Sequence, residues 1–195
     1  MAQRRSLRYL SAISGPKFSY DYVVALKRQV DVTILGYDRD LHYDRHSWWV
    51  IMEAFAPWNE DLRPCLWVDL DTYIFQPHAF DDLDRDKFWM IRDFNTPGRG
   101  ECGVMLLPKD TSEIWNAFLK VKVSESSPPG GFIRQFKHDY LQDHVEGIYS
   151  YKRHCKDSLP EDAVVCCFHG QPKAPDTKGW AKQHWTSLIS PKTSS

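Results

Sequence analysis

The sequence lacks an excess of charge of either sign. Its 25 lysine and arginine residues nearly balance 26 aspartate and glutamate residues, so the formal net charge over 195 residues is −1. Dedicated nucleic-acid binders are normally basic, and we therefore expect no nucleic-acid partner. The sequence also lacks any run that approaches the roughly 20 apolar residues needed to span a bilayer. We expect no transmembrane segment.

Cysteine is scarce, and its spacing does not indicate a framework of disulfides. The five cysteines are an odd number, Cys166 and Cys167 are adjacent, and no C-x-x-C pair indicates a zinc site. This usage predicts reduced, mostly buried thiols in a cytoplasmic protein. The first residues are basic, but Arg8, Ser11 and Ser14 interrupt the apolar run behind them, which makes a poor signal peptide.

Apolar residues, in contrast, are plentiful enough for a core. The sequence is 42% hydrophobic and 14% aromatic, which predicts one folded domain over residues 1–195 with a frayed tail from about residue 188. Strand-like and helix-like segments alternate through the first half, which predicts an α/β fold with a mainly parallel central sheet flanked by helices. The expected strands are residues 6–14, 31–35, 65–75, 87–91, 102–107 and 164–168, and the expected helices are residues 19–30, 46–56, 114–121 and about 132–146.

Two carboxylates interrupt the most apolar of these strands. The segment reads Val68-Asp69-Leu70-Asp71-Thr72, and side chains at i and i+2 of a strand point to the same face. Burying both as charges is costly without compensation, and Mg²⁺ or Mn²⁺ supplies it because these cations prefer carboxylate oxygens. The plain alternative is a chance D-x-D in an acidic stretch. The surrounding apolar residues favour a metal site.

A second polar group follows the last expected strand. His169 comes directly after the apolar segment that ends at Phe168, and Gly170 comes next. A neutral imidazole at this place is able to complete the coordination of a metal. Lys173, four residues further on, places a point charge within reach of a phosphate. Taken alone, His169 is also compatible with an ordinary loop histidine.

Four segments in this order resemble one known family. They are LRYLSAISGPKFSYDYVVAL, CLWVDLDTYIF, GECGVMLLP and CCFHGQPK. The chain resembles a small GT-A-fold nucleotide-sugar glycosyltransferase, similar to the glycogenin and lipopolysaccharide-galactosyltransferase group and its bacterial relatives. The resemblance implies a GT-A-like fold and the metal-dependent transfer of a sugar from a nucleoside-diphosphate sugar, above all a UDP-sugar, to a glycan, a lipid-linked acceptor or another hydroxyl.

The resemblance also implies roles for individual residues. It implies that Asp69, Asp71 and His169 bind Mn²⁺ or Mg²⁺. The residues that it implies for the donor are Ser14, Gly15, Asp69, Gly170 and Lys173.

The catalytic group is less defined than the metal site. Relatives often carry Asn or Ser before the G-V-M segment, whereas this chain has Cys102, preceded by Glu101. An inverting enzyme needs a carboxylate base for the acceptor hydroxyl, and a retaining enzyme does not. Asp139 and Asp93 are the candidates for such a base or for holding the sugar, and each is also compatible with an ordinary polar role.

Two other readings stay open. A chain of this fold without catalysis would be a nucleotide-sugar-binding or assembly subunit. A haloacid-dehalogenase-type phosphatase also begins with D-x-D at a strand end, where the first aspartate is the nucleophile. That motif normally lies on the first strand, whereas about 68 residues precede it here.

Overall fold

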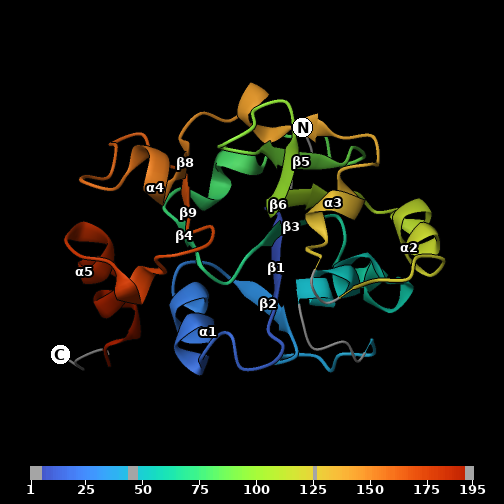
Figure 1. The fold of residues 1–195 in the computed structure, drawn as a ribbon, viewed down its shortest axis with the longest axis horizontal. Coiled ribbons are helices and arrows are strands. Elements are labelled where there is room, and N and C mark those ends of the chain that lie inside the picture. Colours follow the sequence, from blue (N-terminus) through green and yellow to red (C-terminus); the bar gives the residue numbers. More distant parts are fainter. Residues whose placement is uncertain (1–5, 44–47, 125–126, 192–195) are drawn as a thin grey trace.

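A central six-stranded sheet forms the frame of the molecule (Figure 1). The computed structural model describes residues 6–43, 48–124 and 127–191. The strand order is β2-β1-β3-β6-β5-β7. The bounds are β1 (Arg8–Ala12), β2 (Val32–Leu35), β3 (Cys65–Val68), β5 (Trp89–Arg92), β6 (Gly100–Leu107) and β7 (Asp139–Tyr140).

The pairing of these strands is mixed. Strand β1 is parallel to β2 and β3, and β5 is parallel to β7, whereas β6 is antiparallel to β3 and β5. Parallel pairing is therefore the commoner kind among the described strands, and the predicted α/β fold class is confirmed. Because β6 runs against β3, its first residues lie at the edge of the sheet where β3 ends.

The expected strand over residues 65–75 is wrong as a single element. Strand β3 ends at Val68, and a turn follows in which the Thr72 amide donates to the Asp69 carbonyl at 3.0 Å. The chain then enters a second sheet of order β4-β9-β8, with β4 (Thr72–Ile74), β8 (Ile148–Ser150) and β9 (Val165–Cys167). The turn between the two sheets holds both aspartates, so neither sits inside a strand.

Two apolar layers cover the faces of the central sheet. One contains α1 (Tyr20–Lys27), α5 (Trp180–Ile189) and the second sheet, and the other contains η1 (Trp48–Phe55) and α2 (Ser112–Phe118). Figure 1 shows α5 and α2 at opposite ends of the molecule. The remaining helical turns are η2 (Pro57–Leu62), η3 (Pro77–Phe80), α3 (Gly130–Ile133), η4 (Leu141–Asp143), α4 (Tyr151–His154) and η5 (Ala174–Asp176).

Three further expectations differ from the structure. The helix over about 132–146 is absent: α3 covers four residues, and the Asp139 amide donates to the Phe88 carbonyl at 2.9 Å, which draws residues 139–140 into β7 beside β5. Residues 48–55 form a 3₁₀ helix, and residues 46–47 lie outside the described residues. The expected fraying begins too early, because Leu188 is buried within α5. Residues 192–195 lie outside the described residues.

The cysteines follow the prediction. All five are free and buried, as expected for reduced thiols that pack in a core. Among the helices that the structure describes, none is long and apolar enough to cross a membrane.

Candidate active site

A cavity of about 560 Å³ lies at the edge of the central sheet where β1 and β3 end. The segments that follow β1, β3 and β9 line it, together with the start of β6, the start of η1 and residues 128–134. Seven of the nine predicted site residues line this cavity: Ser14, Gly15, Asp69, Asp71, His169, Gly170 and Lys173. In α/β sheets ligands bind outside the carboxyl ends of the strands, and this cavity has that position.

Asp69 is the first carboxylate of the turn. Its backbone amide donates to the Gly103 carbonyl of β6 at 2.9 Å, and the Trp67 indole donates to its Oδ1 at 3.2 Å. Burial, and then the negative charge of Asp71, raise the pKa of Asp69 to about 7. A carboxylate in this environment is stabilised by added positive charge.

Asp71 already has a cation beside it. The Lys173 ammonium forms an ion pair with Asp71 Oδ2 and also donates to the Phe168 carbonyl at 2.8 Å. Both side chains are largely buried, with 6% of Asp71 and 12% of Lys173 exposed. The loop brings Lys173 back over the D-x-D turn, and Gly170 enables this path with φ of +66°, a conformation that favours glycine.

His169 shares the cavity but faces another group. Its ring stacks on Phe94 with centroids 5.7 Å apart, and its Nε2 lies 2.6 Å from the Ser150 hydroxyl. Burial, and then the nearby Lys152 ammonium, lower the pKa of His169 below its ordinary value. The neutral imidazole is the form that a metal ligand requires.

The side chains fit a divalent cation only in part. Asp69 and Asp71 offer hard oxygen ligands, and both the raised pKa of Asp69 and the pairing of Asp71 with an ammonium indicate a need for positive charge here. Within residues 6–43, 48–124 and 127–191, however, no group of three or more His, Cys, Asp or Glu side chains is arranged to hold a metal ion. His169 is therefore not brought together with the two aspartates as a ligand set, and its role in metal binding stays a prediction.

The two candidates for the catalytic base lie elsewhere. Asp139, on β7, forms an ion pair with Lys87 at 3.0 Å. Asp93 follows β5, and its Oδ1 accepts the backbone amides of Asn95 at 2.7 Å and Thr96 at 3.2 Å. Neither residue is among those that line the cavity. The pairing of β7 with β5, in place of the expected helix, explains the position of Asp139.

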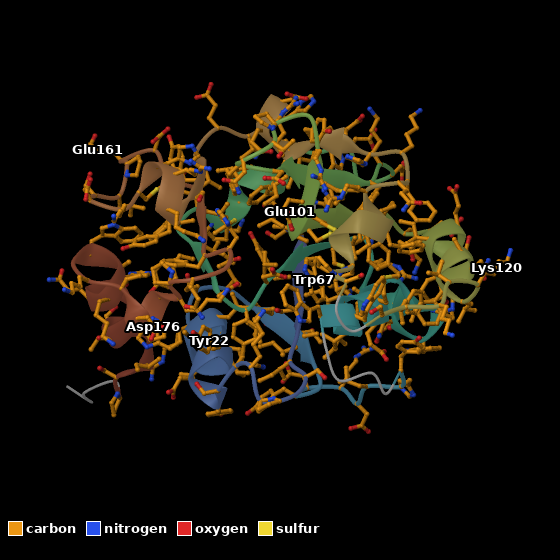
Figure 2. The ribbon with its side chains drawn as sticks, in the orientation of Figure 1. Tyr22, Trp67, Glu101, Lys120, Glu161 and Asp176 are labelled. Carbon is orange, nitrogen blue, oxygen red and sulfur yellow. The ribbon has the colours of Figure 1, made fainter. Side chains whose placement is uncertain are left out.

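Several cavity residues had no predicted role. Lys17 lies between the rings of Phe18 and Trp48, with its ammonium 4.7 Å and 4.8 Å from the two centroids. Glu101 and Arg134 also line the cavity, and Figure 2 shows Glu101 near the middle of the view. The sequence offered one signal for Glu101, a carboxylate two residues before the G-V-M segment. Arg134 has no comparable signal because α3 is a single turn.

Comparison with known proteins supports the fold. No family model matches the sequence, and no curated protein matches it. The structure is similar to the crystal structure of the apo form of the glycosyltransferase GlyE from Streptococcus pneumoniae TIGR4, with a TM-score of 0.60 and 12% sequence identity. The match covers 95% of this chain and 60% of that chain, so this chain spans about three fifths of its length. The fold is therefore similar to that of this glycosyltransferase, and the narrower resemblance to the glycogenin group stays a prediction.

Proposed function

We propose that this protein is a glycosyltransferase that moves a sugar from a nucleoside-diphosphate sugar, UDP-sugars foremost, to a hydroxyl of a glycan or lipid-linked acceptor. One observation carries the proposal: the D-x-D turn and the Gly170–Lys173 loop line the same cavity, at the strand ends of a fold similar to that of a glycosyltransferase. The buried free thiols support a reducing compartment such as the cytoplasm.

Different residues of the cavity would bind different parts of the donor. Ser14 and Gly15 follow β1 and line the same cavity as the D-x-D turn, and they would contact the nucleotide. Asp69 and Asp71 would hold Mn²⁺ or Mg²⁺. When bound, this cation would neutralise the donor diphosphate and the charge that grows on it as the sugar leaves.

Lys173 contributes a charge of its own to this end of the cavity. Its ammonium is bound to Asp71 and to the Phe168 carbonyl, so it is already held beside the turn. An exchange of the Asp71 carboxylate for a phosphate oxygen keeps the ammonium paired with a negative group. Negative charge on the leaving phosphate increases in the transition state, and a cation fixed there therefore accelerates transfer more than it tightens donor binding.

Turnover of a donor panel tests the proposal. The purified protein is incubated with Mn²⁺ and UDP-glucose, UDP-galactose or UDP-N-acetylglucosamine, and released UDP is measured. We expect release from at least one donor, a large loss in Asp71→Asn, and normal release in the matched surface variant Asp86→Asn. Binding of UDP without release from any donor would instead favour a nucleotide-sugar-binding subunit. The absence of both binding and release contradicts the proposal.

A further inference from the structure

Two segments that follow strands of the second sheet meet next to the cavity. Strands β8 and β9 are parallel neighbours, with Ser150 paired with Cys167, so the chain leaves both strands at the same edge of this sheet. Strand β8 continues directly into α4, which carries Lys152 as its second residue, and β9 is followed by the loop that contains His169 and Gly170. His169 and Gly170 line the cavity. The topology therefore brings Lys152 to this loop.

Two side-chain contacts hold α4 against the loop. The Tyr151 ring stacks on Phe168, with centroids 4.8 Å apart and ring planes 18° apart, and both side chains are buried. The Ser150 hydroxyl lies 2.6 Å from His169 Nε2. Because Ser150 and Tyr151 directly precede Lys152, these contacts fix the backbone of Lys152 beside the loop, while its own side chain is exposed.

The Lys152 ammonium lies against Gly170. A Cβ built on Gly170 would be 3.0 Å from Lys152 Nζ, so the ammonium occupies the side of Gly170 on which a side chain would begin. The absence of a side chain lets this ammonium approach the backbone of a residue that lines the cavity. Gly170 also has φ of +66°, a conformation that favours glycine.

The charges around His169 are mostly positive. Burial, and then the Lys152 ammonium, lower the pKa of His169, and Lys173 and Arg153 act in the same direction. Asp93 acts in the opposite direction. Positive charge therefore prevails around this imidazole, which favours a bound anion.

Lys152 differs from the other two cations because it has no partner. Lys173 forms its ion pair with Asp71, and Arg153 Nε donates to Asn95 Oδ1 at 2.8 Å. In the part of the chain that the structure describes, no ion pair engages the Lys152 ammonium. A phosphate oxygen has to displace or share the Asp71 partner of Lys173, whereas Lys152 offers its ammonium without a competing carboxylate.

We propose that Lys152 binds a phosphate of the nucleoside-diphosphate donor beside Gly170; this rests on the proposed function. An exposed ammonium on a long side chain can follow its phosphate as the bond to the sugar breaks. It therefore stabilises the bound donor about as much as the transition state, and its loss should weaken donor binding more than it lowers kcat. In this respect Lys152 differs from Lys173, which the Phe168 carbonyl and Asp71 hold in place.

Calorimetric titration of UDP at low salt, with Mn²⁺ present, tests the role of Lys152. The proteins compared are the wild type, Lys152→Met, Lys152→Arg and the matched control Lys156→Met. Lys156 is exposed just after α4 and is not among the residues that line the cavity, so both methionine variants change the net charge equally. The melting temperature of each variant without ligand reports whether its fold is intact.

We expect Lys152→Met to bind UDP roughly 3- to 10-fold more weakly than the wild type, because an exposed charged hydrogen bond is lost. This loss should shrink in about 0.5 M salt, which screens exposed charges. Lys152→Arg should stay within twofold of the wild type, and Lys156→Met should match it. A loss below threefold in Lys152→Met, or an equal loss in Lys156→Met, overturns the role of Lys152 and leaves the proposed function standing. If the wild type does not bind UDP, the proposed function itself fails.

Discussion

The buried ion pair of Lys173 and Asp71 allows two separate predictions for one variant, one for its stability and one for its rate of catalysis. Lys173→Met removes the ammonium and keeps most of the apolar stem, so Asp71 is left as an uncompensated charge with 6% of its side chain exposed. Removing one partner of a buried ion pair costs about 3–5 kcal/mol. For a protein of this size, that cost lowers the melting temperature by roughly 6–20 °C.

Two further variants test whether the unpaired Asp71 charge causes this loss of stability. Asp71→Asn combined with Lys173→Met removes both charges and should recover most of the lost stability, because the Asp71 charge is no longer left without its partner. Lys120→Met is the matched surface control, since Lys120 is exposed in the turn after α2 and lies at the edge of the molecule in Figure 2. We expect this control to stay within about 0.5 kcal/mol of the wild type.

Catalysis should respond to the same change in a different way. A charged contact that forms on the leaving phosphate is worth about 2–4 kcal/mol in the transition state, so kcat of Lys173→Met should fall roughly 10²- to 10³-fold. Urea unfolding with Mn²⁺ absent and steady-state turnover with Mn²⁺ present give the two numbers. Unfolding within 0.5 kcal/mol of the wild type refutes the buried pair, and kcat within about threefold refutes the phosphate role.

Two further predictions concern the frame around the site. Gly36→Ala should lower the free energy of unfolding by more than about 2 kcal/mol, because φ of Gly36 is +83° and the new Cβ would lie 2.2 Å from the Ile13 carbonyl oxygen. Gly15 has φ of +68° but open space around it, so Gly15→Ala should cost about 1 kcal/mol. Chemical unfolding measures both values. Burial between aromatic rings lowers the pKa of His184, so stability should fall as pH drops below about 6.5, where the unfolded chain gains the proton first. His184→Phe should lose part of that fall, and equal pH slopes for the two proteins would contradict this.

The fold class could be predicted from the sequence because the apolar spacing that marks a strand or a helix lies within a few neighbouring residues. Residues 8–12 and 32–35 are strands within the expected segments 6–14 and 31–35, residues 65–68 are the first part of the expected segment 65–75, and Tyr22 and Leu26 of α1 lie in the core. The expected helix near residues 132–146 failed for a tertiary reason, since β5 offers a free edge that residues 139–140 occupy. A local sequence pattern does not indicate which distant segments pair in a sheet.

The site residues, too, divide into those that a local motif indicates and those that it does not. Asp69, Asp71 and Lys173 were predicted from motifs that each lie within a few residues of a strand end, and the cavity unites them. Glu101 and Arg134 also line the cavity but were not predicted, because Glu101 lies where the pairing of β6 with β5 shifts register and Arg134 follows the single helical turn α3. Neither feature leaves a periodic signal in the sequence. Asp93 and Asp139 are polar residues near expected elements, and the local sequence pattern does not indicate which way those elements turn.

Calorimetric titration of UDP into the wild-type protein, with and without Mn²⁺, shows whether the cavity takes a nucleoside diphosphate. We predict one site per chain, tighter binding with Mn²⁺, and loss of that Mn²⁺ effect in Asp71→Asn with Asp86→Asn unchanged. No binding of UDP to the wild type under either condition, or an equal Mn²⁺ effect in Asp71→Asn, would contradict the claim that the cavity beside the D-x-D turn takes a nucleoside diphosphate.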